Sequence, residues 1–390
     1  MSKTKDLKII RITTAPISLN VLLPGQMRYM REQGMDVLMV SSDGPELKEV
    51  IEREGCRHAI IPMTRRISPW QDLLCLFHLI RLFKREMPDI VHSHTPKAGL
   101  LSMLAAMFAG INTRIHTVSG LRFVSESGFN RFLLLSMERL TAVAATHILV
   151  NGKSLQEKLI KDRISKSFKI SLLGAGSSNG INLGRFTLDN LTPEVMDGVK
   201  KSIQFAPRLK YIICIGRIVE DKGINELVDV FLELNQIDSS LRLLLVGSYE
   251  DDVDPVMRST KRKISTNPNI LVTGWTSNVP YYLSLATLLV HPSHREGFPN
   301  ALLQAGAMGC PIVCSEIAGN IDIVENQIGG LTFKVKNRQS LKNVLLIALS
   351  DDLQMQRYAA ALKIIVVEKF NQPAFWKLLL QKYHSILDSK

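Results

Sequence analysis

The sequence is poor in cysteine, and its cysteines follow no metal-binding or disulfide pattern. Among its 390 residues there are five, without a Cys-x-x-Cys pair. They stand at Cys56, Cys75, Cys214, Cys310 and Cys314. An odd, scattered set of this kind is typical of reduced core thiols, so the sequence favours neither a zinc site nor a disulfide scaffold. We expect no bound metal.

Aromatic residues and long apolar runs are also scarce. Aromatic side chains make up 6% of the chain, whereas 46% is hydrophobic and 22% charged, a composition typical of a globular α/β protein. No uncharged apolar run reaches the roughly 20 residues that a membrane-spanning helix needs. The first residues are polar and do not resemble a secretory signal. We therefore expect a cytoplasmic protein.

Acidic residues are too few to balance the basic ones. The chain has 48 Lys and Arg against 36 Asp and Glu, a net charge of +12. This excess predicts an anionic partner. The candidates are nucleic acid, a phosphorylated substrate and an anionic membrane surface. Because no zinc-finger or RNA-binding signature accompanies the charge, nucleic acid ranks last.

Strand-like and helix-like segments alternate along the chain, which predicts parallel sheets with helices on both faces. The expected strands are residues 8–14, 36–42, 58–63, 89–94, 114–119, 147–151, 169–173, 211–216, 241–247, 269–273, 287–291 and 311–315. A turn-rich segment from Gly174 to Gly180 interrupts the alternation, and we place the domain boundary near residue 190. We expect two Rossmann-like, doubly wound α/β domains, residues 1–190 and 191–372, that face a central ligand-binding cleft.

Two motifs of other enzyme classes are missing or misplaced. A dinucleotide-dependent oxidoreductase needs Gly-x-Gly-x-x-Gly after its first strand, and this chain lacks it. A metal-dependent transferase of a different fold needs Asp-x-Asp at the end of a strand. Asp252-Val253-Asp254 has that spacing but lies in a polar loop.

A basic pair follows the first strand of the second domain. Gly216 ends the expected strand, Arg217 comes next, and Lys222 stands five residues later where a helix is expected to begin. A guanidinium is a two-pronged donor and an ammonium is a point charge, so the two can converge on one anion. The alternative is a solvated basic loop, which the spacing alone does not exclude.

A single carboxylate lies on the loop between strand 287–291 and the next helix. The loop reads His291-Pro292-Ser293-His294-Arg295-Glu296-Gly297-Phe298-Pro299-Asn300. The first N–H groups of the helix point back at this loop, which makes it an anion site with an acid beside it. Glu296 could instead serve only as a helix cap. A cap does not account for the whole pattern Pro-Ser-x-x-Glu-Gly-Phe-Pro.

The order of these motifs resembles the retaining glycosyltransferases of the two-domain GT-B type, the group 1 family, in its bacterial capsule and O-antigen form. In that family the Arg and Lys hold the diphosphate of a nucleotide sugar, and the Glu contacts the transferred hexose. The resemblance implies that Arg217, Lys222 and Glu296 are catalytic residues. It further implies donor contacts at Gly216, Gly274, Gly297, Phe298, Pro299, Asn300 and Gln304.

Two positions depart from the family pattern. A second Glu of the family is Gln304 here, which can still accept a hydrogen bond from a ribose hydroxyl but carries no charge. A Thr-x-His-Gly turn of the family's N-terminal domain has Ser119 in place of the His. His94 and His116 are the other candidates for a sugar or acceptor contact, although a lone His at a strand end is more often structural. A catalytically degenerate binding or scaffold protein therefore remains the alternative hypothesis.

The resemblance also implies a concrete reaction. A hexose or N-acetylhexosamine would move, with retention, from a nucleotide diphosphate sugar, with UDP favoured, to a polyprenyl-diphosphate-linked saccharide in lipopolysaccharide or capsule synthesis. The acceptor hydroxyl would attack on the face that the diphosphate leaves, so neither a protein nucleophile nor a cofactor is expected. The last helix, residues 373–390, would pack back on the first domain.

Two helical segments of the first domain predict contact with a membrane. Residues 70–85 form a helix with a broad apolar face, preceded by Arg65-Arg66, and residues 129–140 are similar. Further arginines near the second segment are Arg122, Arg131 and Arg139. Basic residues beside a broad apolar face suit a helix that rests on an anionic bilayer. The alternative is that both helices only pack on the sheet. We expect peripheral association with the inner face of the cytoplasmic membrane.

Overall fold

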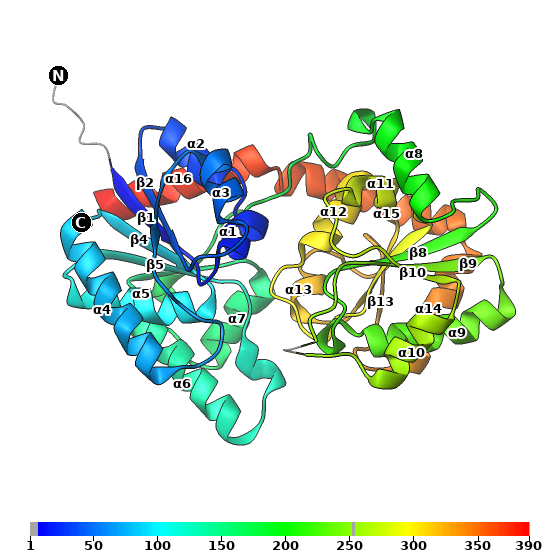
Figure 1. Cartoon of the computed structure of the whole chain (residues 1–390), viewed down its shortest axis with the longest axis horizontal. Coiled ribbons are helices and arrows are strands. Elements are labelled where there is room, and N and C mark those ends of the chain that lie inside the picture. The colour runs from blue at the N-terminus through cyan, green and yellow to red at the C-terminus, as the bar shows by residue number, and fades with distance from the viewer. Residues whose placement is uncertain (1–6, 252–253, 390) are drawn as a thin grey trace. The chain divides into compact units, whose positions relative to one another are not determined.

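The chain divides into two compact units. The computed structural model describes residues 7–251 and 254–389 (Figure 1). Unit 1 comprises Met1–Gly180 and Gln372–Lys390, and unit 2 comprises Ile181–Asn371. The first unit therefore ends earlier than the predicted boundary near residue 190. The reason is that the chain already joins unit 2 at Ile181, whose N–H donates to the carbonyl of Phe370 at 2.7 Å.

Unit 1 is built on a seven-stranded parallel sheet of order β3-β2-β1-β4-β5-β6-β7. Its strands are β1 Lys8–Ile12, β2 Asp36–Ser41, β3 Arg57–Ile60, β4 Ile90–His94, β5 Thr113–Val118, β6 His147–Val150 and β7 Ile170–Leu172. Its α-helices are α1 Pro16–Leu22, α2 Gln26–Glu32, α3 Leu47–Glu54, α4 Pro69–Glu86, α5 Pro96–Phe108, α6 Gly128–Ala144, α7 Lys153–Lys161 and α16 Gln372–Asp388.

Unit 2 repeats the plan on a six-stranded parallel sheet of order β10-β9-β8-β11-β12-β13. Its strands are β8 Lys210–Ile215, β9 Leu241–Val246, β10 Ile270–Val272, β11 Leu288–His291, β12 Ile312–Ser315 and β13 Leu331–Phe333. Its α-helices are α8 Pro193–Ser202, α9 Ile224–Ile237, α10 Arg258–Thr266, α11 Val279–Leu285, α12 Asn300–Met308, α13 Ala318–Ile321, α14 Arg338–Ser350 and α15 Asp352–Lys369. A 3-10 turn, η4, spans Glu220–Lys222.

Both sheets are doubly wound, which confirms the expected fold class. The strand order reverses between β1 and β4 in unit 1 and between β8 and β11 in unit 2. In open α/β sheets, ligands bind beyond the carboxyl ends of the strands at such a reversal. One strand, β13, is not among the strands expected from the sequence, because it has only three residues.

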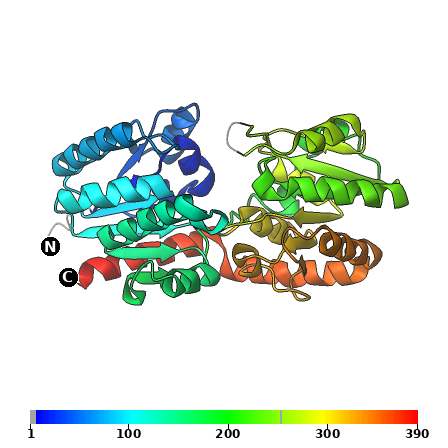
Figure 2. The same cartoon turned by 90° about the horizontal axis from the view of Figure 1, so that it is seen from below.

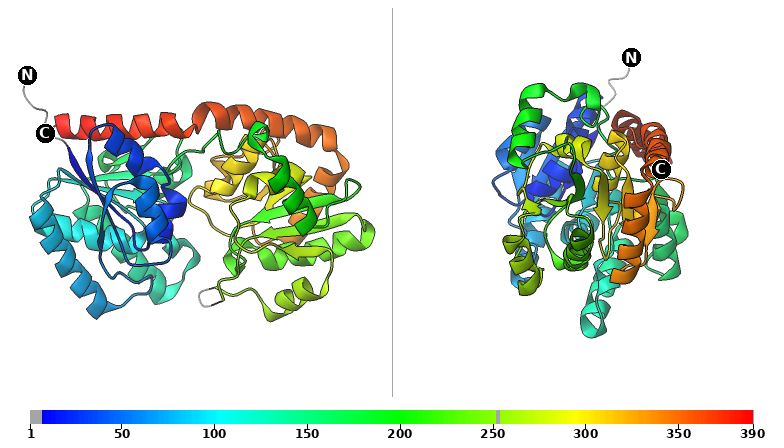
Figure 3. Two further views of the ribbon diagram at one scale, coloured as in Figure 1. Left: turned by 45° about the horizontal axis from the view of Figure 1, so that its top comes forward. Right: turned by 90° about the vertical axis from the view of Figure 1, so that its right-hand side faces the viewer.

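Helices cover both faces of the sheet of unit 1 (Figure 2), and a hydrophobic core lies on each face. Neighbouring residues of β1 show this division: Ile10 packs in the core with Leu79 and Phe83, whereas Ile9 packs in the other core with Tyr383. Continuous apolar strands are the sequence signature of a parallel sheet that is buried on both faces. Figure 3 shows α16, in red, lying along unit 1, where it contacts α2.

A buried polar network ties α16 to the sheet of unit 1. Arg11, on β1, is fully buried, and its guanidinium donates to the Tyr383 hydroxyl at 2.6 Å and to the side-chain carbonyl of Gln26. Tyr383 Oη lies 2.6 Å from His92 Nδ1, and His92 Nε2 lies 2.7 Å from the Thr117 hydroxyl. Burial and the nearby Arg11 charge hold the pKa of His92 well below its usual range. The imidazole is therefore neutral, and Nδ1 can accept the hydroxyl proton of Tyr383.

Replacing the hydroxyl of Tyr383 tests this network. In Tyr383→Phe both Arg11 and His92 lose a partner while they stay buried, so we expect unit 1 to lose about 1–3 kcal/mol of unfolding free energy in urea. The matched control is Tyr358→Phe on α15 in unit 2. That hydroxyl makes none of the hydrogen bonds found among the described residues, so we expect a change below about 0.5 kcal/mol. Equal losses in the two variants would contradict this account.

Candidate functional site

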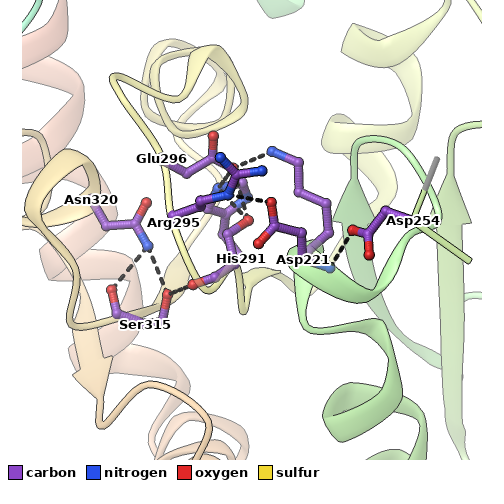
Figure 4. A network of polar contacts seen from close by, with 9 residues as sticks. Asp221, Asp254, His291, Arg295, Glu296, Ser315 and Asn320 are labelled. Carbon is purple, nitrogen blue, oxygen red and sulfur yellow. Dashed lines mark hydrogen bonds and ion pairs between the residues drawn. The ribbon is translucent and has the colours of Figure 1, made fainter. Parts of the chain in front are cut away.

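Two loops of unit 2 meet beyond the carboxyl ends of β8 and β11. Lys222, in η4 after β8, donates from Nζ to Oε1 of Glu296. Glu296 lies on the loop between β11 and α12 (Figure 4). These side chains are 14% to 19% exposed. The sheet thus brings an acid and a base that are 74 residues apart in the sequence into one ion pair.

Glu296 is held by two further side chains at the same oxygen. The Ser293 hydroxyl donates to Oε1 at 2.8 Å, and His291 Nε2 lies 3.0 Å from it. Burial works against the charged carboxylate, but the charge of Lys222 and the contact with His291 outweigh it, so the pKa of Glu296 lies well below its usual range. Glu296 is therefore ionised at neutral pH, and the side-chain contacts of the described residues all use one of its two oxygens.

A second set of contacts braces the two loops against each other. Arg295 Nε donates to the Asp221 carboxylate at 2.5 Å, and the N–H of His294 donates to the carbonyl of Asp221 at 2.8 Å. The His294 ring lies 3.0 Å from Glu226 on α9. These contacts keep Lys222 facing Glu296.

Glycine is required where the two loops touch. Gly223, which precedes α9, has a φ of +69° and lies directly against the carbonyl of Pro292. Any β-carbon at this position would collide with that carbonyl and would also be strained by the positive φ. The Lys-Gly sequence therefore has a structural cause: the lysine reaches the carboxylate only because the next residue has no side chain.

The loop that carries Glu296 is supported from β12 and α13. The Ser315 hydroxyl donates to the carbonyl of Ser293 at 2.5 Å, and Asn320 Nδ2 donates to the carbonyl of Ser315 at 2.9 Å (Figure 4). A β-carbon on Gly319 would come within 2.6 Å of the carbonyl of Gly297. The position of Glu296 is thus fixed from two sides.

Arg217 does not join the ion pair. Its Nη1 donates to the Glu250 carboxylate at 2.5 Å, and its side chain is half exposed. The predicted pair of Arg217 and Lys222 therefore lies at one end of one sheet, but each cation has its own carboxylate.

The predicted donor-binding residues follow the carboxyl ends of three strands of unit 2. Gly216 follows β8, and Gly274 follows β10 with a φ of +71°. The others lie on the β11–α12 loop and on α12: Gly297, Phe298, Pro299, Asn300 and Gln304. Gln304 is half buried and forms none of the hydrogen bonds found within residues 7–251 and 254–389. The ring of Phe298 packs against Phe370 with 5.5 Å between ring centres.

The candidates in unit 1 are mostly buried. His94 has Nε2 2.8 Å from Arg11, and His116 has Nδ1 2.9 Å from the Ser93 hydroxyl. Burial lowers the pKa of His116 to about 4, so this ring is neutral at physiological pH. Ser119 follows β5, and its hydroxyl is buried without a partner among the described residues. Both histidines have structural partners, and neither is exposed.

Sequence reasoning missed the residues that position Glu296. His291 and Ser293 flank Pro292 in the loop that carries the carboxylate, so a test for polar side chains at alternate positions could have found them. The pairs of Arg295 with Asp221 and of His294 with Glu226 join residues 74 and 68 positions apart, and no local pattern marks them.

Across residues 7–251 and 254–389, no helix is long and apolar enough to cross a membrane, and no group of three or more His, Cys, Asp or Glu could hold a metal ion. In the Asp-x-Asp sequence, Asp252 and Val253 lie outside the described residues. Asp254 accepts a hydrogen bond from the N–H of Asp221 at 2.9 Å.

Comparisons with known proteins match both units. A family model described as glycosyl transferases group 1 matches residues 197–363, and one described as glycosyl transferase 4-like domain matches residues 21–170. The capsular polysaccharide biosynthesis glycosyltransferase CapM of Staphylococcus aureus is 34% identical over 383 residues, 98% of each chain. The UDP-Gal:alpha-D-GlcNAc-diphosphoundecaprenol alpha-1,3-galactosyltransferase of Escherichia coli is 27% identical over 93% of this chain and 94% of that one.

A solved structure shares the whole fold. The crystal structure of Anabaena Alr3699/HepE in complex with UDP and glucose has a TM-score of 0.80 with 15% sequence identity. The match covers 97% of this chain and 100% of that chain. At this identity the likeness concerns the fold.

The dependence of Glu296 on Lys222 predicts a pH-dependent loss of stability. Lys222→Met leaves a buried carboxylate without its cation, which we expect to cost about 3–5 kcal/mol of unfolding free energy at pH 8. Because the pKa of Glu296 is lowered in the folded protein, its pairing stabilises fully above the unfolded pKa of about 4.3, and this contribution is lost only as pH falls from there through the lower pKa of the folded state. The cost should therefore shrink as pH is lowered from 4 towards 3.

A matched control separates this effect from the loss of any lysine. Lys342 pairs with Glu233 at 2.7 Å, and that carboxylate also keeps Arg338 as a partner. Lys342→Met should cost less than about 1 kcal/mol at either pH. A Lys222→Met variant that matched this control, or that lost the same stability at pH 3 and pH 8, would contradict the account.

Proposed function

The chain belongs to the glycosyl transferases group 1 family and is a glycosyltransferase of surface polysaccharide synthesis with the GT-B fold, and from this premise we propose its reaction. It transfers a hexose or N-acetylhexosamine, with retention, from a UDP-linked sugar to a polyprenyl-diphosphate-linked saccharide. The donor binds unit 2, and the acceptor binds unit 1. The observation that carries the proposal is the ion pair of Lys222 with the buried, ionised Glu296 beyond the carboxyl ends of β8 and β11.

Lys222 and Arg217 stabilise the leaving diphosphate. Lys222 lies directly before α9, so the positive end of that helix adds to its charge. Arg217, half exposed beside Glu250, moves to the other phosphate as a two-pronged donor. By analogy with other preorganised charge sites, each such group contributes on the order of 3–4 kcal/mol to the transition state.

Glu296 orients the transferred sugar. One carboxylate oxygen is occupied by three donors, so the other oxygen accepts hydrogen bonds from hexose hydroxyls. N–H groups at the start of α12 face the same region and favour the diphosphate. Gln304, on the next turn of α12, accepts a hydrogen bond from a ribose hydroxyl through its amide oxygen.

The transfer needs no nucleophile from the protein. The acceptor oxygen attacks the anomeric carbon on the face that the diphosphate leaves, the bond from that carbon to the diphosphate oxygen breaks, and a phosphate oxygen takes the acceptor proton. The protein contributes positioning and charge stabilisation. No cofactor takes part.

The names of similar proteins support the choice of substrates. The Escherichia coli relative is named as an enzyme that uses UDP-Gal and a diphosphoundecaprenol-linked sugar, and the Anabaena structure contains UDP and glucose. A diphosphate-linked lipid acceptor also accounts for the net charge of +12 and for the apolar surface of unit 1.

That apolar surface lies on the outer side of α4 and α6. Helix α5 lies between α4 and α6 and contacts both (Figure 1). The inner side of α4 packs in the core through Leu79 and Phe83, as the alternative hypothesis expected. The outer side remains exposed, and we call it the apolar face: Trp70, Leu73, Leu74, Phe77, Phe129 and Phe132.

Basic residues continue the exposed stripe of α4. At helical spacing after Phe77, the exposed side chains are Arg81, Lys84 and Arg85. Near α6, Arg131 lies over the Phe123 ring and Arg139 donates to the carbonyl of Asp162, while the side chain of Arg122 lies outside the described part. An apolar stripe beside a basic one suits an anionic bilayer. We propose that the protein works in the cytoplasm and binds the inner membrane face through this surface.

Donor binding is tested by thermal shift and transfer. A selective nucleotide sugar at 100 times its Kd stabilises the protein by about 2.7 kcal/mol. We expect this from UDP sugars and not from GDP or dTDP sugars; stabilisation by GDP sugars alone would refute the UDP assignment. With the sugar that binds, Lys222→Met and Glu296→Gln should lower transfer by about 10²–10³.

The control for the transfer assay is Glu233→Gln. Glu233 lies on α9 and takes no part in the ion pair of Lys222 with Glu296, so this variant should leave the rate unchanged. If no nucleotide sugar is bound, hydrolysed or transferred, and Glu296→Ala changes nothing in the cell, the chain is the catalytically degenerate binding protein of the alternative hypothesis.

Membrane binding is tested by co-sedimentation with vesicles. We expect the protein to bind phosphatidylglycerol vesicles and not phosphatidylcholine vesicles at low salt. Replacing both Trp70 and Phe77 by Ser should weaken binding by about tenfold or more, because each ring buries apolar area in the interface. The matched pair Leu353→Ser and Ile364→Ser, on exposed positions of α15, should have no effect. Equal binding to both lipids would contradict the electrostatic part.

A further inference from the structure

We infer that His291 is a positioning residue for Glu296 that takes up a proton when the donor diphosphate draws Lys222 away. The inference rests on the proposed donor site and goes beyond it, because it couples donor binding to pH. Its basis is the convergence of Lys222, His291 and Ser293 on a single oxygen of a buried carboxylate.

The geometry fixes what His291 does in the free protein. It is the last residue of β11, is 2% exposed, and has Nε2 3.0 Å from Glu296 Oε1 and 3.2 Å from the Ser293 hydroxyl. The hydroxyl of Ser293 is closer to Glu296, at 2.8 Å, and donates to it. Nε2 therefore carries the ring proton and donates to the same carboxylate. With Lys222 present, one cation already balances the one anion at this oxygen.

Donor binding changes that balance. The diphosphate brings negative charge to Lys222. Lys222 then pairs with the phosphate oxygens instead of with Glu296. Glu296 keeps its hydrogen bonds from His291 and Ser293 but loses its charged partner inside a mostly buried site. A carboxylate in contact with an imidazole favours the imidazolium. Protonation of His291 restores a positive charge at the same oxygen.

The other titratable groups around His291 do not take this role. From β8 and β12, Cys214 and Cys314 face the cluster as neutral thiols, since burial raises the pKa of Cys214 to about 12 and raises that of Cys314 further. Asp221 is already paired with Arg295. The remaining competitor is His294, whose ring is paired with Glu226 on α9 rather than with Glu296.

Proton uptake can be counted by calorimetry. The probe is UDP-N-acetylglucosamine, or the nucleotide sugar selected by thermal shift, titrated in buffers of different ionisation enthalpy. A nucleotide sugar is used instead of free UDP because it lacks the terminal phosphate that titrates near pH 6. We expect up to one proton taken up per donor bound near pH 7. Affinity should then fall by up to tenfold per pH unit as pH rises over the range in which a proton is taken up.

Two matched variants assign the proton. His291→Gln keeps a donor near Glu296 without a titratable ring, so uptake should vanish and the affinity should no longer depend on pH, while affinity at pH 8.5 stays within about threefold of wild type. His294→Gln should keep the uptake. If the wild type binds the donor without taking up a proton, the inference is overturned and the proposed function still stands. This outcome is measured on the wild type, so it does not depend on whether a variant folds. Uptake that persists in His291→Gln overturns the inference as well. Failure of every nucleotide sugar to bind overturns the proposed function itself.

Discussion

The ion pair between Lys222 and Glu296 is the contact on which the proposed donor site of unit 2 depends. A buried carboxylate without a partner destabilises the fold. Here Glu296 and its partner Lys222 come from two loops that only the doubly wound sheet of unit 2 brings together. Gly223 makes the approach possible, and the pair of Asp221 with Arg295 holds it. On the proposal made above, Lys222 passes from Glu296 to a ligand phosphate, and a proton on His291 compensates the carboxylate.

The buried charge of Arg11 in unit 1 is held differently. Arg11 is fully buried, and its described partners are the hydroxyl of Tyr383, the amide of Gln26 and the ring of His94, all neutral groups. Such a network is suited to holding α16 in place. The surface that we propose for membrane binding lies instead on the outside of unit 1, on the apolar face of α4 and α6. On this proposal the buried charge of Lys222 serves a ligand, whereas that of Arg11 serves the structure.

The sequence predicts the fold better than it predicts the contacts of the site. Alternating apolar runs reveal every strand except β13, whose three residues are too short to form a pattern. Glu296 and Lys222 are predictable as neighbours, because they follow strands whose carboxyl ends meet. The partner of Arg217 is not predictable, because Glu250 comes from another loop. His94 illustrates the same limit. Its place at a strand end suggests a ligand contact, but its ring contacts Arg11 on the neighbouring strand. No local sequence signal predicts that contact.

The most direct measurement is a crystal structure of the protein with its nucleotide sugar bound. The account predicts the diphosphate beyond the carboxyl ends of β8 and β11, within hydrogen-bond distance of Lys222 Nζ, with a hexose hydroxyl on the oxygen of Glu296 that the protein leaves open. A nucleotide sugar bound elsewhere, with Lys222 still held only by Glu296, would contradict it.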